Sequence, residues 1–336
     1  MKKVAVIGAS GFTGEMLVSL LYNHPQVDLN YLSVRTDKSI KFSDLFPKYR
    51  NKIDITCHNL DKEEAAKNDI VFLSLPHKVS FEQAGFFLDK GKVVIDLSAD
   101  YRIKDLGIYK KYYGVDHGDS QNLAQAVYGL PEFMSDKIKS SKLIANPGCY
   151  PTASLLSSLP LFKEKIVENE IIIDAKSGIS GAGKKAKQEY GYTLINDNLW
   201  AYKPLVHQHL PEMVQEIKNI GGFDVNLRFC PHVIPTERGI YTTAYFWPKR
   251  DLDYNQVKDI YLKYYQNAPF VRVLDTLPVL KDVVGTNFCD IGFGFSEDKK
   301  MLIVCSAIDN LIKGAAGQAI QNMNIICGFD QTTGLL

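Results

Sequence analysis

One cysteine of the chain stands in a sequence context that can make it a nucleophile. Cys149 lies in the segment NPGCYPT at 146–152, between an expected strand at 143–145 and a helical pattern at 153–159. Pro151 fits the first turn of a helix, where it sacrifices no hydrogen bond. The amide groups and the positive dipole at a helix start lower the pKa of a thiol, and the thiolate is the reactive form. We therefore expect Cys149 to be catalytic; a cysteine that merely lies at a helix start is the alternative.

Two histidines and a glutamate are the best candidates for a partner that transfers protons. In the segment HQHLPE, which contains His207, Glu212 follows His209 by three residues, so these two side chains share a face of a helical turn. The carboxylate of Glu212 would orient the imidazole of His209 and support its charged form. A metal site and a surface cluster are the alternatives. We expect no metal, because the spacing differs from the helical H-E-x-x-H pattern of zinc sites.

A glycine-rich turn near the N-terminus predicts a dinucleotide site. It follows an expected strand at 4–7, opens an expected helix at 12–22, and has the spacing G-x-x-G-x-x-G. Glycines let the backbone approach a pyrophosphate, whose charge is favoured by the amide groups at a helix start. A plain tight turn is the alternative. The residues expected at the cofactor are Gly8, Ser10, Gly11, Phe12, Thr13 and Gly14.

The second expected strand indicates which nicotinamide cofactor fits. An NAD site usually offers an acidic residue about 20 positions beyond the glycine turn, at the end of this strand. Asp28 has that spacing but precedes the apolar run at 29–34. The far end of the run instead carries Ser33 and Arg35, a hydroxyl group and a cation that suit a 2′-phosphate. We therefore expect NADP; an exposed arginine in a polar loop is the alternative.

A thiolate beside a nicotinamide implies a specific chemistry. Attack of the sulfur on an acyl derivative forms a thioester, which hydride reduces to a hemithioacetal and then to an aldehyde. This scheme needs a residue that takes up and donates protons, and His209 is the candidate.

The elements that must position these residues form two domains. In the first third, short β-branched runs alternate with helical patterns, as in the βαβ units of a parallel sheet. Beyond position 146, longer strands alternate polar and apolar residues, as in a mixed sheet with one wetter face. We expect an α/β protein with a Rossmann-type parallel-sheet cofactor domain and an α+β catalytic domain with a mixed sheet. The expected domains are 1–148 plus 312–336 and 149–311, and one final helix at 311–326 would pack on the first domain.

The individual elements follow from the same patterns. The expected strands of the first domain lie at 4–7, 29–34, 53–57, 70–75, 92–97 and 143–145, and its helices at 12–22, 62–67 and 80–89. The expected strands of the second domain lie at 170–176, 225–233, 240–247, 288–295 and 301–307.

Composition and charge exclude several classes of partner. The 336 residues include 39 Lys plus Arg and 38 Asp plus Glu, so the formal charge is +1. With this balance the chain has no excess of positive charge that would favour binding to nucleic acid or to an acidic membrane surface. No apolar run reaches the ~18 residues that span a bilayer, and glycines interrupt the N-terminal apolar run before it reaches the length of a signal peptide. Six scattered cysteines without a C-x-x-C pair fit reduced thiols, so we expect a cytoplasmic protein.

Seven ordered motifs carry a resemblance to a known family over nearly the whole chain. They are GASGFTG at 8–14, DLSADYR at 96–102, YGLPE at 128–132, NPGCYPT at 146–152, SGISGAGK at 177–184, HQHLPE at 207–212 and PHVIPTERGIYTT at 231–243. With these motifs the chain resembles the N-acetyl-γ-glutamyl-phosphate reductases, within the wider aspartate-semialdehyde dehydrogenase-like superfamily.

The resemblance implies a reaction and roles for four residues. The reaction is NADPH-dependent reduction of an N-acyl-γ-glutamyl phosphate to the semialdehyde, with release of inorganic phosphate, in arginine biosynthesis. The resemblance implies that Cys149 is the nucleophile, His209 the acid–base residue, Glu212 its orienting carboxylate and His207 a substrate contact. It also implies a homo-oligomer, a tetramer or a dimer, formed through the sheet of the second domain, which would then serve dimerisation as well as catalysis.

Other residues are candidates by their position. Arg102 follows a parallel strand and suits a phosphoryl anion, with a surface salt bridge as the alternative, and Asn146 is a further substrate-binding candidate. Asn310 would bind the carboxamide of the nicotinamide or cap the final helix. Three residues of a second glycine turn would cover the nicotinamide end or form only a tight loop: Ser180, Gly181 and Gly183.

Three other functions fit parts of the pattern. An aspartate-semialdehyde dehydrogenase shares the thioester chemistry with a shorter substrate, but the H-x-H-x-P-E cluster disfavours it. An N-acyl-aminoadipyl-phosphate reductase acts on a chain one methylene longer, a difference that discriminates by only about 1 to 3 kcal/mol, so the acyl group and the chain length stay open. A non-catalytic NADP-binding regulator would need none of Cys149, His209 and Glu212.

Overall fold

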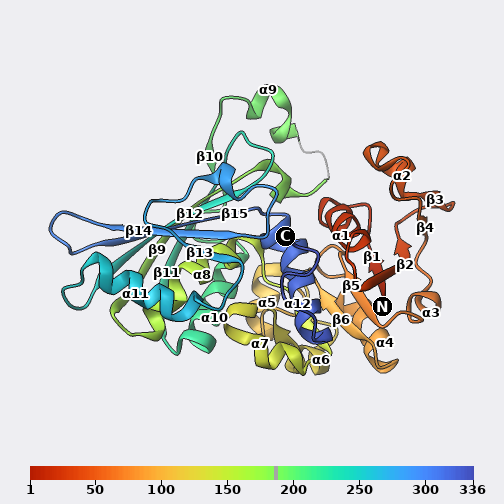
Figure 1. The fold of residues 1–336 in the computed structure, drawn as a ribbon, viewed down its shortest axis with the longest axis horizontal. Coiled ribbons are helices and arrows are strands. Elements are labelled where there is room, and N and C mark those ends of the chain that lie inside the picture. Colours follow the sequence, from red (N-terminus) through yellow and green to blue (C-terminus); the bar gives the residue numbers. More distant parts are fainter. Residues whose placement is uncertain (185–187) are drawn as a thin grey trace. The chain divides into compact units, whose positions relative to one another are not determined.

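The computed structural model describes residues 1–184 and 188–336, which divide into two compact units. The first unit holds Met1–Pro147 and Ala315–Leu336, and the second holds Gly148–Gly314. The C-terminal segment from Ala315 onward, which holds α12 and has the darkest blue in Figure 1, therefore belongs to the same unit as the red N-terminal strands. The expected boundaries, after 148 and after 311, lie one and three residues from the observed ones, after 147 and after 314.

A mainly parallel sheet forms the centre of the first unit. Within the described residues it has eight strands in the order β3-β4-β2-β1-β5-β6-β8-β7. Every neighbouring pair is parallel except β3 with β4, which confirms the Rossmann-type prediction. The strands are β1 (Lys2–Ile7), β2 (Val27–Ser33), β3 (Ile40–Lys41), β4 (Thr56–His58), β5 (Ile70–Leu73), β6 (Val93–Asp96), β7 (Val127–Tyr128) and β8 (Leu143–Ala145).

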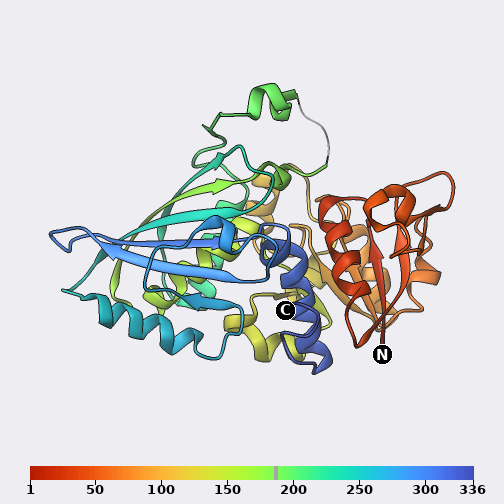
Figure 2. The same ribbon diagram turned by 45° about the horizontal axis from the view of Figure 1, so that its top comes forward.

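Helices pack against this sheet. The residues of the central strand β1 that they bury are apolar. Val4, Ala5 and Val6 have no exposed surface, as expected for a strand covered on both faces. Helix α1 runs beside β1 in Figure 2, and α12 packs against α1 and α7. The helices are α1 (Phe12–Tyr22), α2 (Phe42–Leu45), α3 (Lys62–Ala65), α4 (Phe81–Asp89), α5 (Leu106–Tyr113), α6 (Ser120–Gln125), α7 (Pro131–Lys139) and α12 (Gly317–Cys327).

The turn between β1 and α1 requires two of its three glycines for packing. Gly8 has a φ of +91°, and a Cβ atom there would lie 2.3 Å from the carbonyl oxygen of Ser74. A Cβ atom on Gly14 would lie 2.2 Å from the carbonyl oxygen of Gly8. Around the Cβ position of Gly11, in contrast, no heavy atom of the described chain beyond its neighbours lies within 4 Å. Gly11 therefore leaves open space at the start of α1.

A mixed sheet forms the second unit, as predicted. Among the described residues its seven strands follow the order β10-β11-β9-β12-β15-β14-β13. The helices α8, α10 and α11 lie on one face of this sheet (Figure 1). The strands are β9 (Val167–Ser177), β10 (Trp200–Ala201), β11 (Asn226–Val233), β12 (Ile240–Pro248), β13 (Val271–Val273), β14 (Cys289–Phe295) and β15 (Leu302–Ile308), and the helices are α8 (Cys149–Lys163), α9 (Tyr192–Ile195), α10 (His209–Gly221) and α11 (Tyr254–Tyr265).

Helix α8 is held tightly in the core of the second unit. The hydroxyl of Ser306 on β15 donates to the carbonyl oxygen of Ala153 at 2.9 Å. Pro160 has no N–H group and would leave the carbonyl of Leu156 without its helical donor. The hydroxyl of Tyr265 on α11 donates to that carbonyl instead. The helix that carries Cys149 thus keeps its backbone satisfied despite an internal proline.

The opposite face of the second sheet carries a row of half-buried apolar side chains. Tyr245 on β12 pairs with Ile172 on β9 and with Ile303 on β15. These positions alternate with Thr242 and Ser306, which point toward α8 and are fully buried. Ile172, Tyr245 and Ile303 are each only partly covered by the chain itself.

Two predicted elements differ from the structure. The expected strand at 53–57 is only β4, because the amide of Ile53 bonds the carbonyl of Tyr49 in a turn. The expected single helix at 311–326 is a π-helical turn, Ile312–Ala316, followed by α12. The amide of Gly314 reaches the carbonyl of Asp309, five residues back, which is the π-helical spacing. No helix of the described chain has the length and apolar character that crossing a bilayer requires.

Candidate active site

Cys149 is the first residue of helix α8. The N-cap is Gly148, whose φ of −66° and ψ of 156° are extended and which, as a glycine, has no side chain to cap this helix end. The first amide groups of α8 therefore have no acceptor within the helix and point toward its N-terminal end, where Cys149 lies. Cys149 is half-buried. The prediction that this cysteine lies at a helix start is confirmed, and such a position stabilises a thiolate.

The carboxylate of Glu212 joins the starts of two helices. His209 and Glu212 both lie in the first turn of α10, and Glu212 is fully buried. The Oε1 atom of Glu212 accepts a hydrogen bond of 2.8 Å from the amide of Gly148. The spacing predicts that Glu212 orients His209, and the structure shows its carboxylate bonded to the residue before the nucleophile. Cys149 and His209 are thus placed by one buried contact.

Tyr150 packs its ring against the imidazoles of His207 and His209. Its ring centroid lies 5.6 Å from that of His207 and 5.9 Å from that of His209, and the two imidazoles are 4.8 Å apart. The hydroxyl of Tyr202 donates to that of Tyr150 at 3.1 Å. Burial raises the pKa of both phenols, so both stay protonated near neutral pH. Sequence reasoning missed Tyr150, although its place directly after Cys149 is a signal that could have found it.

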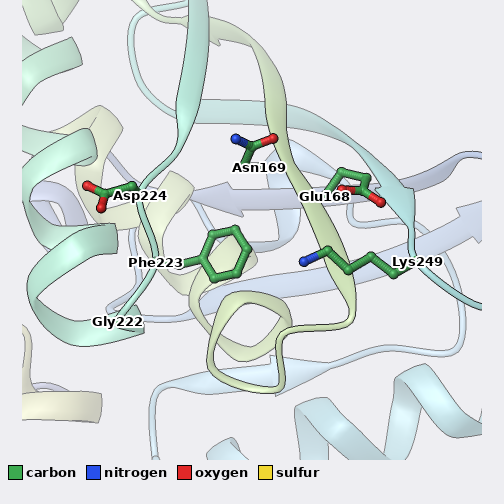
Figure 3. A pocket seen from close by; sticks show the side chains of 6 residues that line it. All are labelled: Glu168, Asn169, Gly222, Phe223, Asp224 and Lys249. Atoms are coloured by element: carbon green, nitrogen blue, oxygen red, sulfur yellow. The ribbon is translucent and has the colours of Figure 1, made fainter.

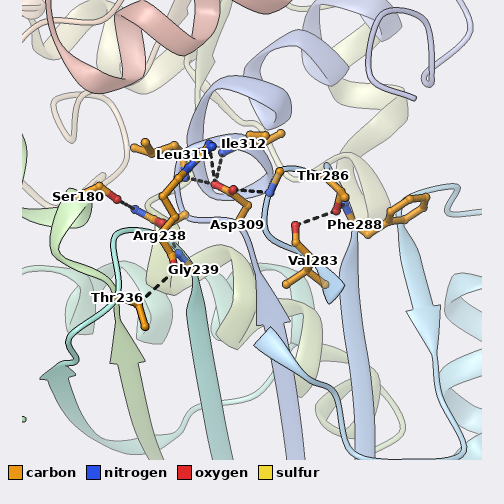
Figure 4. Close-up of polar contacts among 12 residues, drawn as sticks. Ser180, Thr236, Arg238, Gly239, Val283, Thr286, Phe288, Asp309, Leu311 and Ile312 are labelled. Carbon is orange, nitrogen blue, oxygen red and sulfur yellow. Dashed lines mark hydrogen bonds and ion pairs between the residues drawn. The ribbon is translucent and has the colours of Figure 1, made fainter. Parts of the chain in front are cut away.

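Asp309 organises the turn that precedes the C-terminal segment (Figure 4). Its Oδ1 atom accepts from the amides of Leu311 and Ile312 at 2.8 and 3.1 Å and from the guanidinium of Arg238 at 3.2 Å. Its Oδ2 atom accepts from the amide of Gly285 at 2.8 Å. Asp309 therefore caps the amide groups at this helix start.

Asn310 ties the second glycine turn to the same region (Figure 4). Its Oδ1 atom accepts from the amide of Gly239 at 2.7 Å, and its Nδ2 atom donates to the hydroxyl of Ser180 at 3.0 Å. Of the two roles that the sequence leaves open for Asn310, the structure does not show the helix cap, because its oxygen bonds Gly239, and binding of the nicotinamide carboxamide stays a prediction. Ser180 belongs to the 3-10 turn Ile179–Ala182 with Gly181, and Gly183 follows with a φ of +82°.

Gly314 lies where the turn that contains Asp309 and Asn310 packs against Cys149. A Cβ atom at Gly314 would lie 2.9 Å from the Cβ atom of Cys149, and the amide of Gly314 bonds the carbonyl of Asp309 at 2.9 Å. Within the second unit, a chain of contacts therefore runs from Ser180 through Asn310 and Asp309 to Cys149. The structure brings the second glycine turn and the catalytic candidates into one continuous part of this unit.

The first glycine turn has the features that a dinucleotide pyrophosphate requires. Gly11 is the N-cap of α1 and, as a glycine, has no side chain to cap this helix. The amides of the first turn, at Phe12, Thr13 and Gly14, therefore remain available to an anion, and Gly11 and Ser10 are half-buried beside them. The open space at Gly11 completes a surface that fits a pyrophosphate.

The end of β2 lies beside this turn. The carbonyl of Ser33 accepts from the amides of Gly8 and Ala9 at 3.0 and 2.9 Å. Arg35 follows two residues later and is exposed, whereas Asp28 is the second residue of β2 and lies at the opposite end of the strand. The guanidinium of Arg35, and not the carboxylate of Asp28, therefore lies at the end of β2 that is next to the glycine turn.

Arg102 and Asn146 are buried residues of the first unit that hold its strand ends. The Nε atom of Arg102 donates to the carbonyl of Asn146 at 2.7 Å, and a terminal nitrogen donates to the carbonyl of Leu97 at 2.8 Å. These carbonyls follow β8 and β6, so the guanidinium bridges the carboxyl ends of two parallel strands. The side chain of Asn146 donates to the carbonyl of Ala315 at 3.1 Å and accepts from Asn322 at 3.1 Å. Both residues thus fix the start of the segment that leads to Cys149.

A surface hollow of about 370 Å³ lies elsewhere in the second unit (Figure 3). It is lined by Glu168, Asn169, Gly222, Phe223, Asp224 and Lys249, and the ammonium of Lys249 lies 4.7 Å from the Phe223 ring centroid. Gly222 directly follows α10 whereas His209 begins it, so roughly 20 Å of helix separates the hollow from the imidazole of His209. The hollow therefore lies apart from the residues suited to catalysis.

Among residues 1–184 and 188–336, no three His, Cys, Asp or Glu side chains come together as a metal site.

Family models match both units of the chain. Residues 3–141 match the model described as "Semialdehyde dehydrogenase, NAD binding domain", and residues 149–310 match "Semialdehyde dehydrogenase, dimerisation domain". The site that fits a pyrophosphate thus lies in a nicotinamide-binding domain, and Cys149 opens the second matched domain.

Curated relatives match over nearly the full length. Proteins named N-acetyl-gamma-glutamyl-phosphate reductase from Methanosphaera stadtmanae and Pelotomaculum thermopropionicum are 45% and 43% identical, and each alignment covers 99% of this chain and 96% or 97% of the relative. One from Campylobacter jejuni is 44% identical over 99% of this chain and 97% of its own.

Solved structures share the fold at low sequence identity. Aspartate semialdehyde dehydrogenase II of Vibrio cholerae, complexed with ASA, superposes with a TM-score of 0.74 at 18% identity over 98% of both chains. The aspartate semialdehyde dehydrogenase of Candida albicans with NADP gives a TM-score of 0.72 at 18% identity, over 97% of this chain and 98% of its own. These similarities establish the fold. The substrate has to be inferred from the residues of the site.

Loss of the Glu212 carboxylate is expected to destabilise the second unit. Glu212→Ala leaves the buried amide of Gly148 without an acceptor, which costs about 2–3 kcal/mol of unfolding free energy. Glu212→Gln keeps an oxygen at the same place and is expected to cost about 1 kcal/mol or less. Thermal unfolding of the two variants measures this difference, and equal melting temperatures for both would contradict it.

Proposed function

Because the chain belongs to the family of N-acetyl-gamma-glutamyl-phosphate reductases, we propose that it reduces an N-acyl-γ-glutamyl phosphate to the semialdehyde and inorganic phosphate, as a step of arginine biosynthesis. The observation that carries this proposal is the placement of Cys149 at the start of α8, joined through Glu212 to the helix that begins with His209. A thiol, an imidazole and a carboxylate in the first turns of two helices that a hydrogen bond joins are the groups that acyl transfer needs.

The chain's own residues account for the covalent steps. His209 takes up the proton of the Cys149 thiol, and Glu212, in the same helical turn, supports the imidazolium. The Cys149 Sγ atom then bonds to the acyl carbon, and phosphate leaves with the electron pair of the broken carbon–oxygen bond. The product is a thioester on Cys149. As the carbon–sulfur bond breaks and the aldehyde is formed, its electron pair stays on the sulfur, and His209 returns its proton there to restore the Cys149 thiol.

The first unit holds the cofactor, for which we propose NADP. The residues that would bind the pyrophosphate are those of the turn from Gly8 to Gly14, with Ser33 and Arg35 at the adenosine 2′-phosphate. We propose that Ser180, Gly181, Gly183 and Asn310 lie at the nicotinamide end, because their contacts continue to Cys149. When bound, the reduced nicotinamide supplies the hydride that converts the thioester to the aldehyde.

Arg102 and Asn146 complete the proposed substrate site. A guanidinium at the carboxyl ends of two parallel strands suits the phosphoryl group. Asn146 acts through its position, since its side chain is bonded to Ala315 and Asn322.

We propose that a second copy of the chain covers the open face of the second sheet. Ile172, Tyr245 and Ile303 form an apolar row there, and the matching family model is described as a dimerisation domain.

All six cysteines are free thiols, which fits the reducing cytoplasm that we propose as the location.

Replacement of Cys149 is expected to abolish the reaction. With NADP, phosphate and N-acetylglutamate semialdehyde, the wild-type protein should form reduced nicotinamide, measured by absorbance. Cys149→Ser should lose about 10⁴-fold or more, as in other nucleophile–base units. The control Cys327→Ser changes a half-buried thiol of α12 and should keep the wild-type rate. Turnover only with aspartate or aminoadipate semialdehydes would replace the proposed substrate, and no turnover with any of them would remove the proposed activity.

Removal of the Arg35 guanidinium is expected to weaken binding of NADP selectively. One charge-assisted bond to a phosphate contributes about 1.5–3 kcal/mol, so Arg35→Ala should raise the Kd of NADP about 10- to 100-fold. The Kd of NAD should change less than about twofold, since NAD has no 2′-phosphate. Titration calorimetry measures both constants, with the exposed Arg250→Ala as the control. Equal weakening of both cofactors would contradict the role of Arg35.

A charge in the apolar row of the second sheet is expected to dissociate the oligomer. Tyr245→Glu places a carboxylate between Ile172 and Ile303, where an interface would have to bury it unpaired. Sedimentation velocity should change from a multiple of 37.7 kDa to 37.7 kDa. Tyr22→Glu, at an exposed tyrosine of α1, is the control and should leave the wild-type mass. A wild-type protein that sediments at 37.7 kDa would contradict the proposed interface.

A further inference from the structure

Arg238 is a charged residue of the second unit that the proposed mechanism leaves without a role. It lies in the motif PHVIPTERGIYTT at 231–243, two residues before β12. Its backbone is fixed against the second glycine turn, since the amide of Ser180 donates to the carbonyl of Glu237 at 3.0 Å. A Cβ atom at Gly178 would lie 2.8 Å from the backbone nitrogen of Arg238. The chain therefore determines closely where this side chain begins.

The guanidinium of Arg238 leaves most of its N–H groups unused within the chain. Its Nη2 atom donates to the Oδ1 atom of Asp309 at 3.2 Å (Figure 4), and 18% of the side chain is exposed. The Nε atom is shielded from solvent and has no hydrogen-bond partner within residues 1–184 and 188–336. A charged donor that is buried without an acceptor costs free energy, so native proteins rarely keep one without a reason.

Arg272 in the same unit shows how a carboxylate normally fills such a guanidinium. Its Nε and Nη2 atoms both donate to the carboxylate of Asp290, at 2.5 and 2.8 Å, which is the paired geometry that suits this planar group. Asp309 does not bind Arg238 in this way. Its Oδ1 atom also accepts two helix-start amides, and its Oδ2 atom accepts the amide of Gly285. Arg238 thus keeps donors that a bound anion can use.

The turn that holds Arg238 also contacts the nucleophile. The carbonyl oxygen of Asp309 accepts from the amide of Gly314 at 2.9 Å. A Cβ atom at Gly314 would lie 2.9 Å from the Cβ atom of Cys149. Asp309 therefore binds the guanidinium through its side chain and the glycine beside Cys149 through its backbone, so that both belong to one rigid part of the second unit.

We propose that Arg238 binds the α-carboxylate of the acylated amino acid, an inference that rests on the proposed function. An N-acyl-γ-glutamyl phosphate carries two anionic groups, the phosphoryl group that leaves and the α-carboxylate that does not react. Arg102 is the cation proposed for the first group. Two methylene groups separate the acyl carbon that bonds to Cys149 from the carbon that bears the second. A guanidinium with unused N–H donors suits this carboxylate, which is present whichever acyl group the nitrogen carries.

Neither a neighbouring cation nor a purely structural role accounts for these observations as well. Lys313 is fully buried, and its ammonium lies 5.7 Å from the ring centroid of the buried Phe270, in the core of the unit. A structural Arg238 would need only the contact of its Nη2 atom with Asp309 and would leave the Nε–H group without a use. The proposed contact gives this group an acceptor and makes Arg238 a residue that determines specificity.

Two semialdehydes test the contact in the reverse assay with NADP and phosphate. One is N-acetylglutamate semialdehyde, and the other is 4-acetamidobutanal, which lacks only the α-carboxylate. A site that bonds a carboxylate rejects an analogue without it, because its buried donors then have no partner. The wild-type protein should therefore prefer N-acetylglutamate semialdehyde by about 10²- to 10³-fold in kcat/KM.

Two variants of Arg238 and a matched control identify the source of this preference. Arg238→Lys keeps a cation for Asp309 but lacks the planar fork, so it should reduce the preference about tenfold or more, through a loss with N-acetylglutamate semialdehyde alone. Arg238→Gln should reduce it to about threefold or less. Any general loss from a displaced Asp309 affects both semialdehydes and cancels in the ratio. The control Arg272→Gln breaks the pair with the buried Asp290 and should keep the wild-type preference.

The opposite outcomes overturn the assignment. A wild-type preference in both Arg238 variants, when circular dichroism shows them folded, contradicts binding of the carboxylate. Equal loss with both semialdehydes, together with a raised KM for inorganic phosphate, would place Arg238 at the phosphoryl group instead. A wild-type protein that turns over both semialdehydes equally well contradicts this inference but not the proposed function, whereas turnover of neither removes the proposed function and this inference with it.

Discussion

The buried hydrogen bond between the carboxylate of Glu212 and the amide of Gly148 is the interaction on which the active site depends. It joins the first turn of α10 to the residue before α8, so the proposed base and the proposed nucleophile take their positions together. A hydrogen bond to a charged group contributes about 1.5–3 kcal/mol, and a buried carboxylate deprived of its partners costs about 3–5 kcal/mol. Any conformation that separates the two helix starts therefore carries a large energetic cost.

The fold makes this contact rigid from both sides. Helix α8 is fixed to the sheet by Ser306 and to α11 by Tyr265, which replaces the backbone donor that Pro160 lacks. Gly314 lies so close to Cys149 that no side chain fits between them. Because catalytic groups must be held to within fractions of an ångström, a nucleophile on a buried helix is better placed than one on a loop. The shared fold of the semialdehyde dehydrogenases provides the scaffold, and the site residues set the chemistry.

The sequence predicts the parts of this site that depend on neighbouring residues. The start of a helix at Cys149 follows from the residues around it, and the glycine turn follows from the spacing between a strand and a helix. Contacts between distant residues were not predictable in the same way. Glu212 bonds an amide 64 residues away, and Asn310 bonds Gly239 and Ser180 across 71 and 130 residues. Local pattern does not reveal which distant donor a carboxylate or an amide will meet, so the sequence alone leaves two roles open for Asn310, whereas the structure shows that Asp309 accepts the helix-start amides.

Reactivity of the six thiols in the ligand-free protein tests most directly whether the chain alone prepares Cys149 for attack. The measurement is the rate of iodoacetamide labelling of each cysteine as a function of pH, followed by mass spectrometry. Cys149 should react fastest near neutral pH, and its rate should reach half of its maximum below the value of about 8.5 that is typical of a free thiol. Labelling of Cys149 no faster than that of the half-buried Cys230, or a midpoint at or above about 8.5, would contradict a nucleophile activated by the starts of α8 and α10.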